Sequence, residues 1–124
     1  YIDNLVAVTA ISASASHSVA LIRDGSVVAV GDNSYSQCDT DSWTDIVAIS
    51  ASTYHTVGLK SDGSVIAVGD NSYGKCDIDS WTDIVAISAD DYHTVGLKSD
   101  GSVVVAYTGP SDVDTWFNIK LSSR

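Results

Sequence analysis

The stretch HTVGLKSDGSV at residues 55–65 decides the fold, and it recurs letter for letter at residues 93–103. Its first six residues alternate as a strand does, and a second apolar run begins at Val65. Asp62-Gly63 lies between the two runs and predicts a two-residue hairpin turn, because glycine accepts a positive φ and aspartate tolerates one. The stretch therefore predicts a pair of antiparallel strands.

The chain repeats itself with a period of 38 residues. Equivalent histidines are His17, His55 and His93, and equivalent tryptophans are Trp43 and Trp81. A fixed period of this size is typical of stacked or ring-arranged units, none of which can bury its apolar face alone. We therefore expect one domain of three repeats followed by a terminal capping strand. The repeat bounds are about 5–42, 43–80 and 81–113, and the capping strand lies within 114–124.

Each repeat is predicted to be an antiparallel meander. In the second repeat the expected strands are 45–50, 55–60 and 65–68, and a short outer strand within 73–79 is an open alternative. Val, Ile and Thr are abundant while the helix formers Glu and Met are absent, which favours an all-β fold. The apolar runs are purer than those of a one-faced sheet, so we expect both faces of each meander to be covered by neighbours around an axis.

The charge of the chain limits its partners. All 16 acidic residues are aspartate, and with only six Lys and Arg they give a formal net charge of −10. We expect no nucleic acid partner, because phosphate binding needs Lys and Arg. We also expect no membrane insertion, because no apolar run approaches the roughly 18–20 residues of a membrane span. The charge instead favours solubility and a basic partner.

The repeat unit VAISAxxYHTVGLKSDGSVxAVGDNSYGKC resembles that of the regulator of chromosome condensation repeat family. The resemblance runs from about Leu5 to Val104 and continues faintly to Leu121. The short period is similar to that of the compact bacterial form of the family, seen in beta-lactamase inhibitory protein II. The resemblance implies a β-propeller whose members mostly bind other proteins. The exchange activity of the founding member is not implied, since it depends on an inserted loop for which no unit here has room.

The number of repeats departs from that family pattern. A propeller ring needs about four to eight blades, and this chain has three repeats and an extra strand. Three explanations stay open: a fragment of a larger propeller, a homo-oligomer that completes a ring, or another β architecture such as a trefoil- or prism-like barrel. Ile2–Leu5 aligns with Thr40–Trp43, so the chain begins inside the repeat register, as expected for a cut from a longer protein. We expect propeller blades.

One turn varies while the repeats around it are constant. Residues 41–65 and 79–103 differ only where Ser-Thr at 52–53 becomes Asp-Asp at 90–91. Loops on a rigid scaffold are where binding usually resides, and tyrosine is a favoured contact residue. Neutral variation of a solvent-exposed loop is the alternative. The candidate partner-binding residues of this turn are Tyr54, Asp90, Asp91 and Tyr92.

A second candidate face comprises Tyr35 and Tyr73, which lie in the Asp-Asn-Ser-Tyr loops. Aromatic rings beside Asn and Asp suit sugar binding, so a lectin-like module that binds a glycan is an alternative function. The structural interpretation of the same residues is that each ring packs over an outer strand.

The remaining repeated residues are interpreted as structural. The resemblance implies that His17, His55 and His93 each open a strand and hold the preceding turn, and no metal is expected. Trp43, Trp81 and Trp116 are expected to pack between units. Cys38 and Cys76 are expected to lie beyond disulfide reach and to act as small apolar side chains. No calcium loop, phosphate-cradling loop or catalytic triad can be placed, so we expect no cofactor and no enzyme.

These observations favour a non-catalytic protein–protein interaction module that uses loop residues on a propeller rim. A carbohydrate-binding module and a purely structural subunit of a larger assembly are the alternatives. The acidic surface, rich in Asn, Ser and Thr, and the short repeats lead us to expect a bacterial protein that is secreted or displayed at the cell surface.

Overall fold

The computed structural model describes residues 7–72 and 74–107, which form three antiparallel sheets of three strands. The predicted all-β class is confirmed. In each sheet the strands lie in sequence order, as in a meander. The strands are β1 (Val8–Ala13), β2 (His17–Ile22), β3 (Val27–Gly31), β4 (Ile46–Ala51), β5 (His55–Lys60), β6 (Val65–Gly69), β7 (Ile84–Ala89), β8 (Thr94–Lys98) and β9 (Val103–Ala106).

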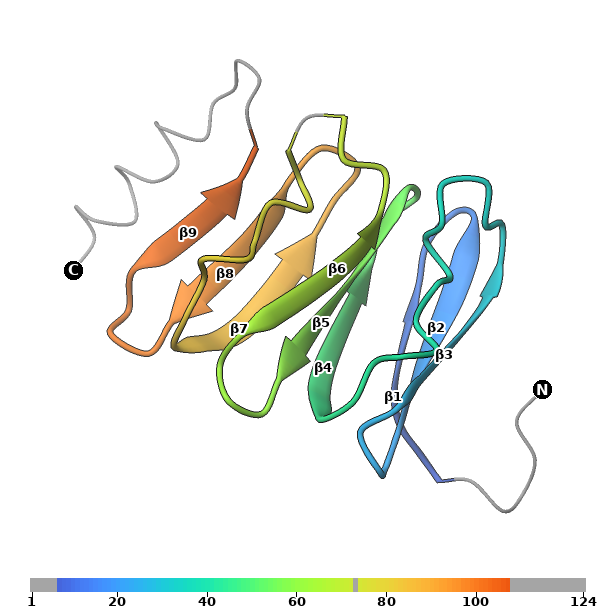
Figure 1. Cartoon of the computed structure of the whole chain (residues 1–124), viewed down its shortest axis with the longest axis horizontal. Helices are drawn as coiled ribbons and strands as arrows, with labels where there is room; N and C mark the ends of the chain where they lie inside the picture. The colour runs from blue at the N-terminus through green and yellow to red at the C-terminus, as the bar shows by residue number, and fades with distance from the viewer. Residues whose placement is uncertain (1–6, 73, 108–124) are drawn as a thin grey trace.

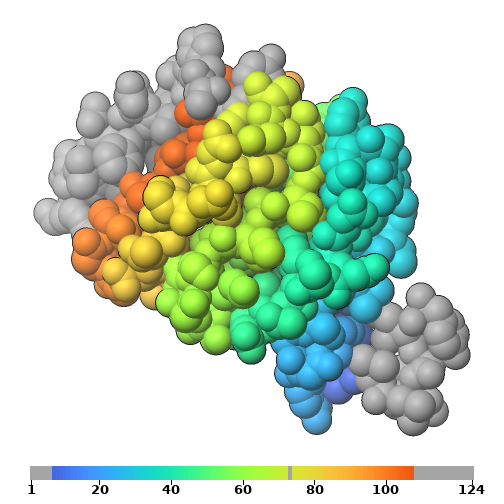
Figure 2. Space-filling model, viewed as in Figure 1, coloured from blue at the N-terminus to red at the C-terminus, as the bar shows by residue number. Residues whose placement is uncertain are grey.

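Figure 1 shows the three sheets stacked in chain order, with strands running between two edges of the molecule. One edge, called here the hairpin edge, holds the turns from β2 to β3, β5 to β6 and β8 to β9. The opposite edge, called here the rim, holds the turns between the first two strands of each sheet and the loops after β3 and β6. Figure 2 shows the colours of successive sheets following one another across the same view.

The three hairpin turns are alike and differ from the predicted two-residue turn. The Gly63 N–H donates to the Lys60 carbonyl (3.0 Å), and the Lys60 N–H donates to the Ser64 carbonyl (2.9 Å). Gly63 has a φ of +88°, whereas Asp62 has no positive φ, so the loop has three residues and a glycine bulge. The Asp62 carboxylate accepts the Ser64 N–H (2.9 Å) and hydroxyl (2.6 Å) instead. The prediction was wrong because this local hydrogen bond favours a type I turn.

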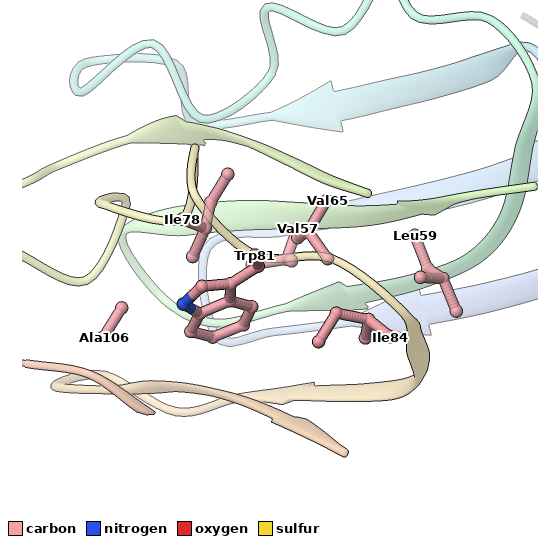
Figure 3. Packing of buried hydrophobic residues seen from close by; sticks show 7 residues of the cluster. All are labelled: Val57, Leu59, Val65, Ile78, Trp81, Ile84 and Ala106. Atoms are coloured by element: carbon pink, nitrogen blue, oxygen red, sulfur yellow. The ribbon is translucent and has the colours of Figure 1, made fainter. Parts of the chain in front are cut away.

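The core lies in the two junctions, the interfaces between consecutive sheets. Trp43 is 2% exposed and packs with apolar residues of the first and second sheets. Figure 3 shows Trp81 in the equivalent place, at the centre of the next cluster. The other members of that cluster are Val57, Leu59, Val65, Ile78, Ile84 and Ala106.

The indole rings also explain two glycines in central strands. A Cβ at Gly58 would lie 2.8 Å from the Trp43 ring, and a Cβ at Gly96 would lie 2.8 Å from the Trp81 ring. The ring therefore fits only because the strand facing it has no side chain at that position. Large apolar side chains buried at such sites dominate the energetics of a core.

The structure bears on one open alternative, a fourth strand, and on one expectation, the covering of both faces of each sheet. The connections that follow β3 and β6 hold no fourth strand in the part of the chain that is described, so they cross from rim to hairpin edge as turns. No other described sheet covers the outer face of the first sheet, and Ile11 on that face is 80% exposed. Trp116 and the capping strand predicted within 114–124 lie outside the described residues.

Candidate functional site

The rim brings together the three variable turns, which belong to different repeats. Residues from all three line one shallow groove of about 450 Å³. The groove residues are Ser14, Ala15, Ala51, Ser52, Thr53, Ala89, Asp90, Asp91 and Tyr92. Three of the four residues singled out in the variable turn, Asp90, Asp91 and Tyr92, therefore line one continuous surface.

The rim also unites the two faces that sequence reasoning treated separately. The rings of Tyr35 and Tyr54 meet edge to face, with centroids 5.2 Å apart and planes at 79°. Tyr35 comes from the loop after β3, and Tyr54 comes from the turn between β4 and β5 of the next sheet. The two rings are 48% and 38% exposed, and Tyr92 is 60% exposed. Tyr73 lies outside the described residues.

Asp90 holds its own turn together. Its Oδ1 accepts the N–H groups of Tyr92 (2.8 Å) and His93 (2.7 Å), and it pairs with His93 Nδ1 at 3.0 Å. Partial burial raises the pKa of Asp90, but the bonds from Tyr92 and His93 outweigh burial and hold that pKa below its ordinary value. Ser52 has the equivalent place in the second sheet, where its hydroxyl accepts the His55 N–H at 3.2 Å.

Asp91 links two neighbouring turns. Its Oδ1 accepts the Thr53 N–H at 3.0 Å, across the second junction. On the other side of the same turn, the Ser16 hydroxyl donates to the Thr53 carbonyl at 2.5 Å. The three variable turns thus form a hydrogen-bonded row, and this row fixes the positions of the tyrosines beside it.

The loops that carry the Asp-Asn-Ser sequence are rigid through their own hydrogen bonds. The Asn33 side chain donates to Asp39 (3.0 Å) and accepts the Cys38 N–H (2.7 Å). Asp32 accepts the Ser34 N–H and hydroxyl at 3.2 and 3.0 Å. The same bonds recur in the loop after β6. The polar side chains of these loops therefore build the scaffold under Tyr35.

Sequence reasoning missed the two buried polar residues beneath the rim. Gln37 is 0% exposed and donates to the Thr53 carbonyl at 3.3 Å. Lys75 has the equivalent place 38 residues later and is 1% exposed, with its Nζ 2.7 Å from Asp70. The side-chain bond to Lys75 lowers the pKa of Asp70, although burial acts against it. Their shared position in the repeat was the available signal.

Two of the three histidines connect neighbouring sheets. His55 Nε2 lies 2.7 Å from the Thr94 hydroxyl, which donates to the Lys75 carbonyl at 2.6 Å. The Thr94 proton is thereby used, so Nε2 donates and Nδ1 accepts from Ser52 at 2.5 Å. Burial, and secondarily Lys75, lower the pKa of His55 to about 4, so the ring is neutral at pH 7.

His17 repeats this arrangement at the first junction. Its Nε2 lies 2.6 Å from the Thr56 hydroxyl, which donates to the Gln37 carbonyl at 2.6 Å. Burial lowers the pKa of His17 as well. Within residues 7–72 and 74–107 no three His, Cys or Asp side chains are grouped to hold a metal ion.

The two cysteines are free and half-buried. Cys38 Sγ lies 3.3 Å from the Asp32 carbonyl, and Cys76 Sγ lies 3.6 Å from the Asp70 carbonyl. Burial raises the pKa of Cys76 to about 11, so its thiol stays protonated and unreactive at neutral pH.

The sequence matches one family of repeats. The family model for the Regulator of chromosome condensation (RCC1) repeat matches residues 8–37 and 46–75, which span the first two sheets and the rim loop after each. No curated protein matches the chain. Within the described residues, no helix has the length and apolarity that crossing a membrane requires.

Solved structures show where this fold occurs. Prp20p from Saccharomyces cerevisiae, studied with its binding to Gsp1p and histones, is similar with a TM-score of 0.72 and 17% identity, over 90% of this chain and 34% of that chain. Yeast RCC1 (Prp20) bound to Kap60 is similar with a TM-score of 0.70 and 16% identity, over 85% of this chain and 30% of that chain. The ectodomain of the Physcomitrella patens receptor kinase CR4 is similar with a TM-score of 0.68 and 17% identity, over 85% of this chain and 31% of that chain.

The chain therefore spans about a third of the length of these structures. At these identities the likeness concerns the fold alone. The three sheets are β-propeller blades, as predicted, and they form an incomplete set.

Proposed function

We propose that this chain, which belongs to the regulator of chromosome condensation repeat family, is a non-catalytic protein-binding module that uses its rim. The observation that carries the proposal is the group of exposed aromatic side chains there, namely Tyr35, Tyr54 and Tyr92. Tyrosine offers a large, rigid contact surface at a low cost in side-chain entropy. The hydrogen-bonded row of turns beside these rings supplies the fixed backbone that such a contact surface needs.

Charge indicates the kind of protein that would bind. Asp90 and Asp91 line the rim groove. Arg23, Lys60 and Lys98 follow or end the second strand of each sheet and so lie at the hairpin edge. Lys75 beneath the rim is paired with an aspartate. We propose a partner surface rich in Lys and Arg, and the binding of Prp20p to histones supports this class of partner for the fold.

Catalysis is not part of the proposal. Ser52 and His55 are the described pair that most resembles a nucleophile and its base, with 2.5 Å between Oγ and Nδ1. They are 4% and 0% exposed, and the far nitrogen of the histidine is bonded to Thr94. Little of the pair is therefore open to a substrate, and its hydrogen bonds hold the turn and the junction together. We propose no cofactor either.

A carbohydrate is the second candidate ligand. The edge-to-face Tyr35–Tyr54 pair leaves ring surface exposed, and Asp90 and Asp91 line the groove nearby. Stacking on a tyrosine face together with hydrogen bonds from sugar hydroxyls suits such a site. For either ligand we propose a location outside a bacterial cell or on its surface, in line with the acidic, Asn-, Ser- and Thr-rich composition.

Binding to defined ligands tests the proposal. The chain would be measured by biolayer interferometry against an array of Lys/Arg-rich peptides and, separately, against a glycan array. We expect a peptide hit whose affinity falls about tenfold or more in the Tyr54→Ala variant, as for an aromatic contact residue.

A matched pair of charge variants sharpens this test. Asp90→Asn keeps an oxygen that can hold the turn but removes the rim charge, and we expect it to weaken peptide binding. Asp79→Asn changes an exposed aspartate in the connection from β6 to β7 and should leave binding unchanged. Equal effects of both variants, or hits confined to glycans, would refute a protein partner bound at the rim.

A further inference from the structure

The same set of hydrogen bonds closes both junctions. Near the hairpin edge, the Ile46 N–H donates to the Gly25 carbonyl at 3.0 Å, and the Ile84 N–H donates to the Gly63 carbonyl at 3.0 Å. These four residues come from consecutive sheets and are related by the repeat period. The bond is therefore a property of the junction itself.

Two further bonds recur nearer the rim. The Ala51 N–H donates to the Ser12 hydroxyl, and the Ala89 N–H donates to the Ser50 hydroxyl, both at 3.0 Å. The third bond is the histidine-to-threonine contact described above, at 2.6 and 2.7 Å. At each junction the later sheet thus supplies two N–H groups and one hydroxyl. The earlier sheet supplies the groups that bond to them: a carbonyl, a serine hydroxyl and a histidine Nε2.

The outer face of the first sheet carries a copy of the half that supplies two N–H groups and a hydroxyl, and no other described sheet packs against it. Val8 is 41% exposed, whereas the equivalent Ile46 and Ile84 are 3% and 4% exposed. Ser18 is exposed too, although the equivalent Thr56 and Thr94 are fully buried. The N–H group of Ala13, the residue equivalent to Ala51 and Ala89, completes this half.

The third sheet carries the complementary half, which has a histidine Nε2, a backbone carbonyl and a serine hydroxyl. His93 Nε2 is a buried nitrogen that has no hydrogen-bond partner in the described part of the chain. Gly101 and Ser88 occupy the positions of the carbonyl and hydroxyl acceptors in the two closed junctions. Within residues 7–72 and 74–107, the hydrogen-bonding groups of one junction half therefore lie at each end of the stack of sheets.

The apolar contacts match in the same way. In the second sheet Ile49, Ala51, Ile66 and Val68 pack against the first sheet. Their equivalents on the first sheet line an apolar groove of about 350 Å³. Within that groove Ile11 is 80% exposed and Val30 is 54% exposed. The described apolar residues of this face thus match those that the second sheet packs into the first junction.

We propose that a second copy of this chain docks its third sheet on the outer face of the first sheet. The contact pairs His93 with Ser18, Ser88 with the Ala13 N–H, and the Gly101 carbonyl with the Val8 N–H, and it continues the pattern of the two internal junctions. Two copies joined in this way at both ends form a ring of six blades, within the range of about four to eight that propellers use.

Charge and salt make a specific prediction about this contact. The three pairs and the apolar groove contain no carboxylate, while each copy carries a formal net charge of −10. Repulsion between the copies is therefore long-range, and salt screens it. We expect association to strengthen as the salt concentration rises from about 0.05 to 0.5 M, where the Debye length becomes much shorter.

Solution mass tests the proposal directly. The chain would be measured by light scattering behind a sizing column, over a range of concentrations and with reductant present so that Cys38 and Cys76 stay free. We expect a species of 26.0 kDa, which is two chains of 13.0 kDa. A mass of 13.0 kDa at every concentration and salt level would overturn the proposal.

Three variants locate the contact. Ile11→Asp places a charge in the groove at an exposed residue, so it leaves the single chain folded and should give 13.0 kDa. Val47→Asp is the matched control, since Val47 is an exposed strand residue outside the groove (54%), and it should stay at 26.0 kDa. Ser18→Ala should weaken association about fivefold through loss of one hydrogen bond. A dimer that tolerates Ile11→Asp would also overturn the proposal.

Discussion

The hairpin edge is built the same way in all three sheets, whereas the rim is built differently in each. The Asp-Gly-Ser turns at 24–26, 62–64 and 100–102 share one set of hydrogen bonds. The rim turns read Ser-Ala-Ser at 14–16, Ser-Thr-Tyr at 52–54 and Asp-Asp-Tyr at 90–92.

The difference has a structural cause. At the hairpin edge, the Gly25 and Gly63 carbonyls are bonded to the next sheet, so these turns hold the junctions as well as the hairpins. At the rim, either a serine hydroxyl or an aspartate carboxylate can accept the histidine N–H, so the turn tolerates a change of side chain. The constant edge therefore holds the fold, and the variable edge is where we propose that a partner binds.

The largest effect on the free energy of unfolding is expected in the second junction, whose core lies between the rim and the hairpin edge. Trp81→Ala should lower the free energy of unfolding by about 3–5 kcal/mol, because it removes a buried indole ring from between two sheets. Urea unfolding followed by circular dichroism measures this. Val85→Ala, at a 55% exposed strand position, is the control and should change little. A loss below about 1 kcal/mol for Trp81→Ala would contradict this packing role.

The next largest effect concerns the buried underside of the rim. His55 has a folded-state pKa of about 4 against an ordinary 6.5, so the unfolded chain binds more protons between these values. The free energy of unfolding should therefore fall as the pH drops from 6.5 towards 4, by about 3 kcal/mol from this residue. Below that range, the lowered pKa of Asp70 adds a further loss.

Urea unfolding at a series of pH values measures this slope. His55→Gln removes the titrating group, and in this variant the slope between pH 4 and 6.5 should shrink to the part contributed by His17, whose pKa burial also lowers. An unchanged slope in the variant would mean that His55 is not the group responsible.

A smaller effect is expected from the hairpin turns. Gly63 has a φ of +88°, and a Cβ there would lie 3.2 Å from the Asp83 backbone. Gly63→Ala should lower the free energy of unfolding by about 1–2 kcal/mol, mostly through the left-handed backbone conformation. Ser61→Ala, at an exposed residue of the same turn, is the control for thermal denaturation. Equal melting temperatures for the two variants would refute this constraint.

The smallest effect on stability is expected at the rim surface. Tyr92 is 60% exposed, so Tyr92→Ala should change the free energy of unfolding by less than about 0.5 kcal/mol. The same variant should lose binding to a basic peptide that the native chain binds. A variant that loses stability and binding together would show that the rim and the fold are not separable in the way proposed.

The repeat period made the strands predictable. The expected strands 55–60 and 65–68 agree with β5 and β6 to within one residue, because short runs of apolar and β-branched residues on either side of Asp-Gly mark two strands of a hairpin. The turn between them was predicted wrongly, since Asp-Gly fits either a two-residue or a three-residue loop, and the hydrogen bond that Asp62 accepts from the Ser64 N–H favours the longer one.

Contacts between repeats could not be predicted in the same way. Tyr35 and Tyr54 meet only because consecutive sheets stack, which a period alone does not specify. Lysine is usually a surface residue, yet Lys75 is 1% exposed and its Nζ is paired with Asp70. One sequence signal was available: Trp43 is accompanied by Gly58 and Trp81 by Gly96 at the same spacing, as expected of residues that fit together.

Nuclear magnetic resonance of the 13.0 kDa chain tests the central claim, the division between a binding rim and a structural hairpin edge, most directly. A Lys/Arg-rich peptide would be titrated into labelled protein while the amide signals are followed. The account predicts shifts confined to turns 14–16, 52–54 and 90–92 and to the loop around Tyr35. Shifts centred on the hairpin turns at 24–26, 62–64 and 100–102 would contradict it. The absence of any shift with every Lys/Arg-rich peptide tried would contradict it as well.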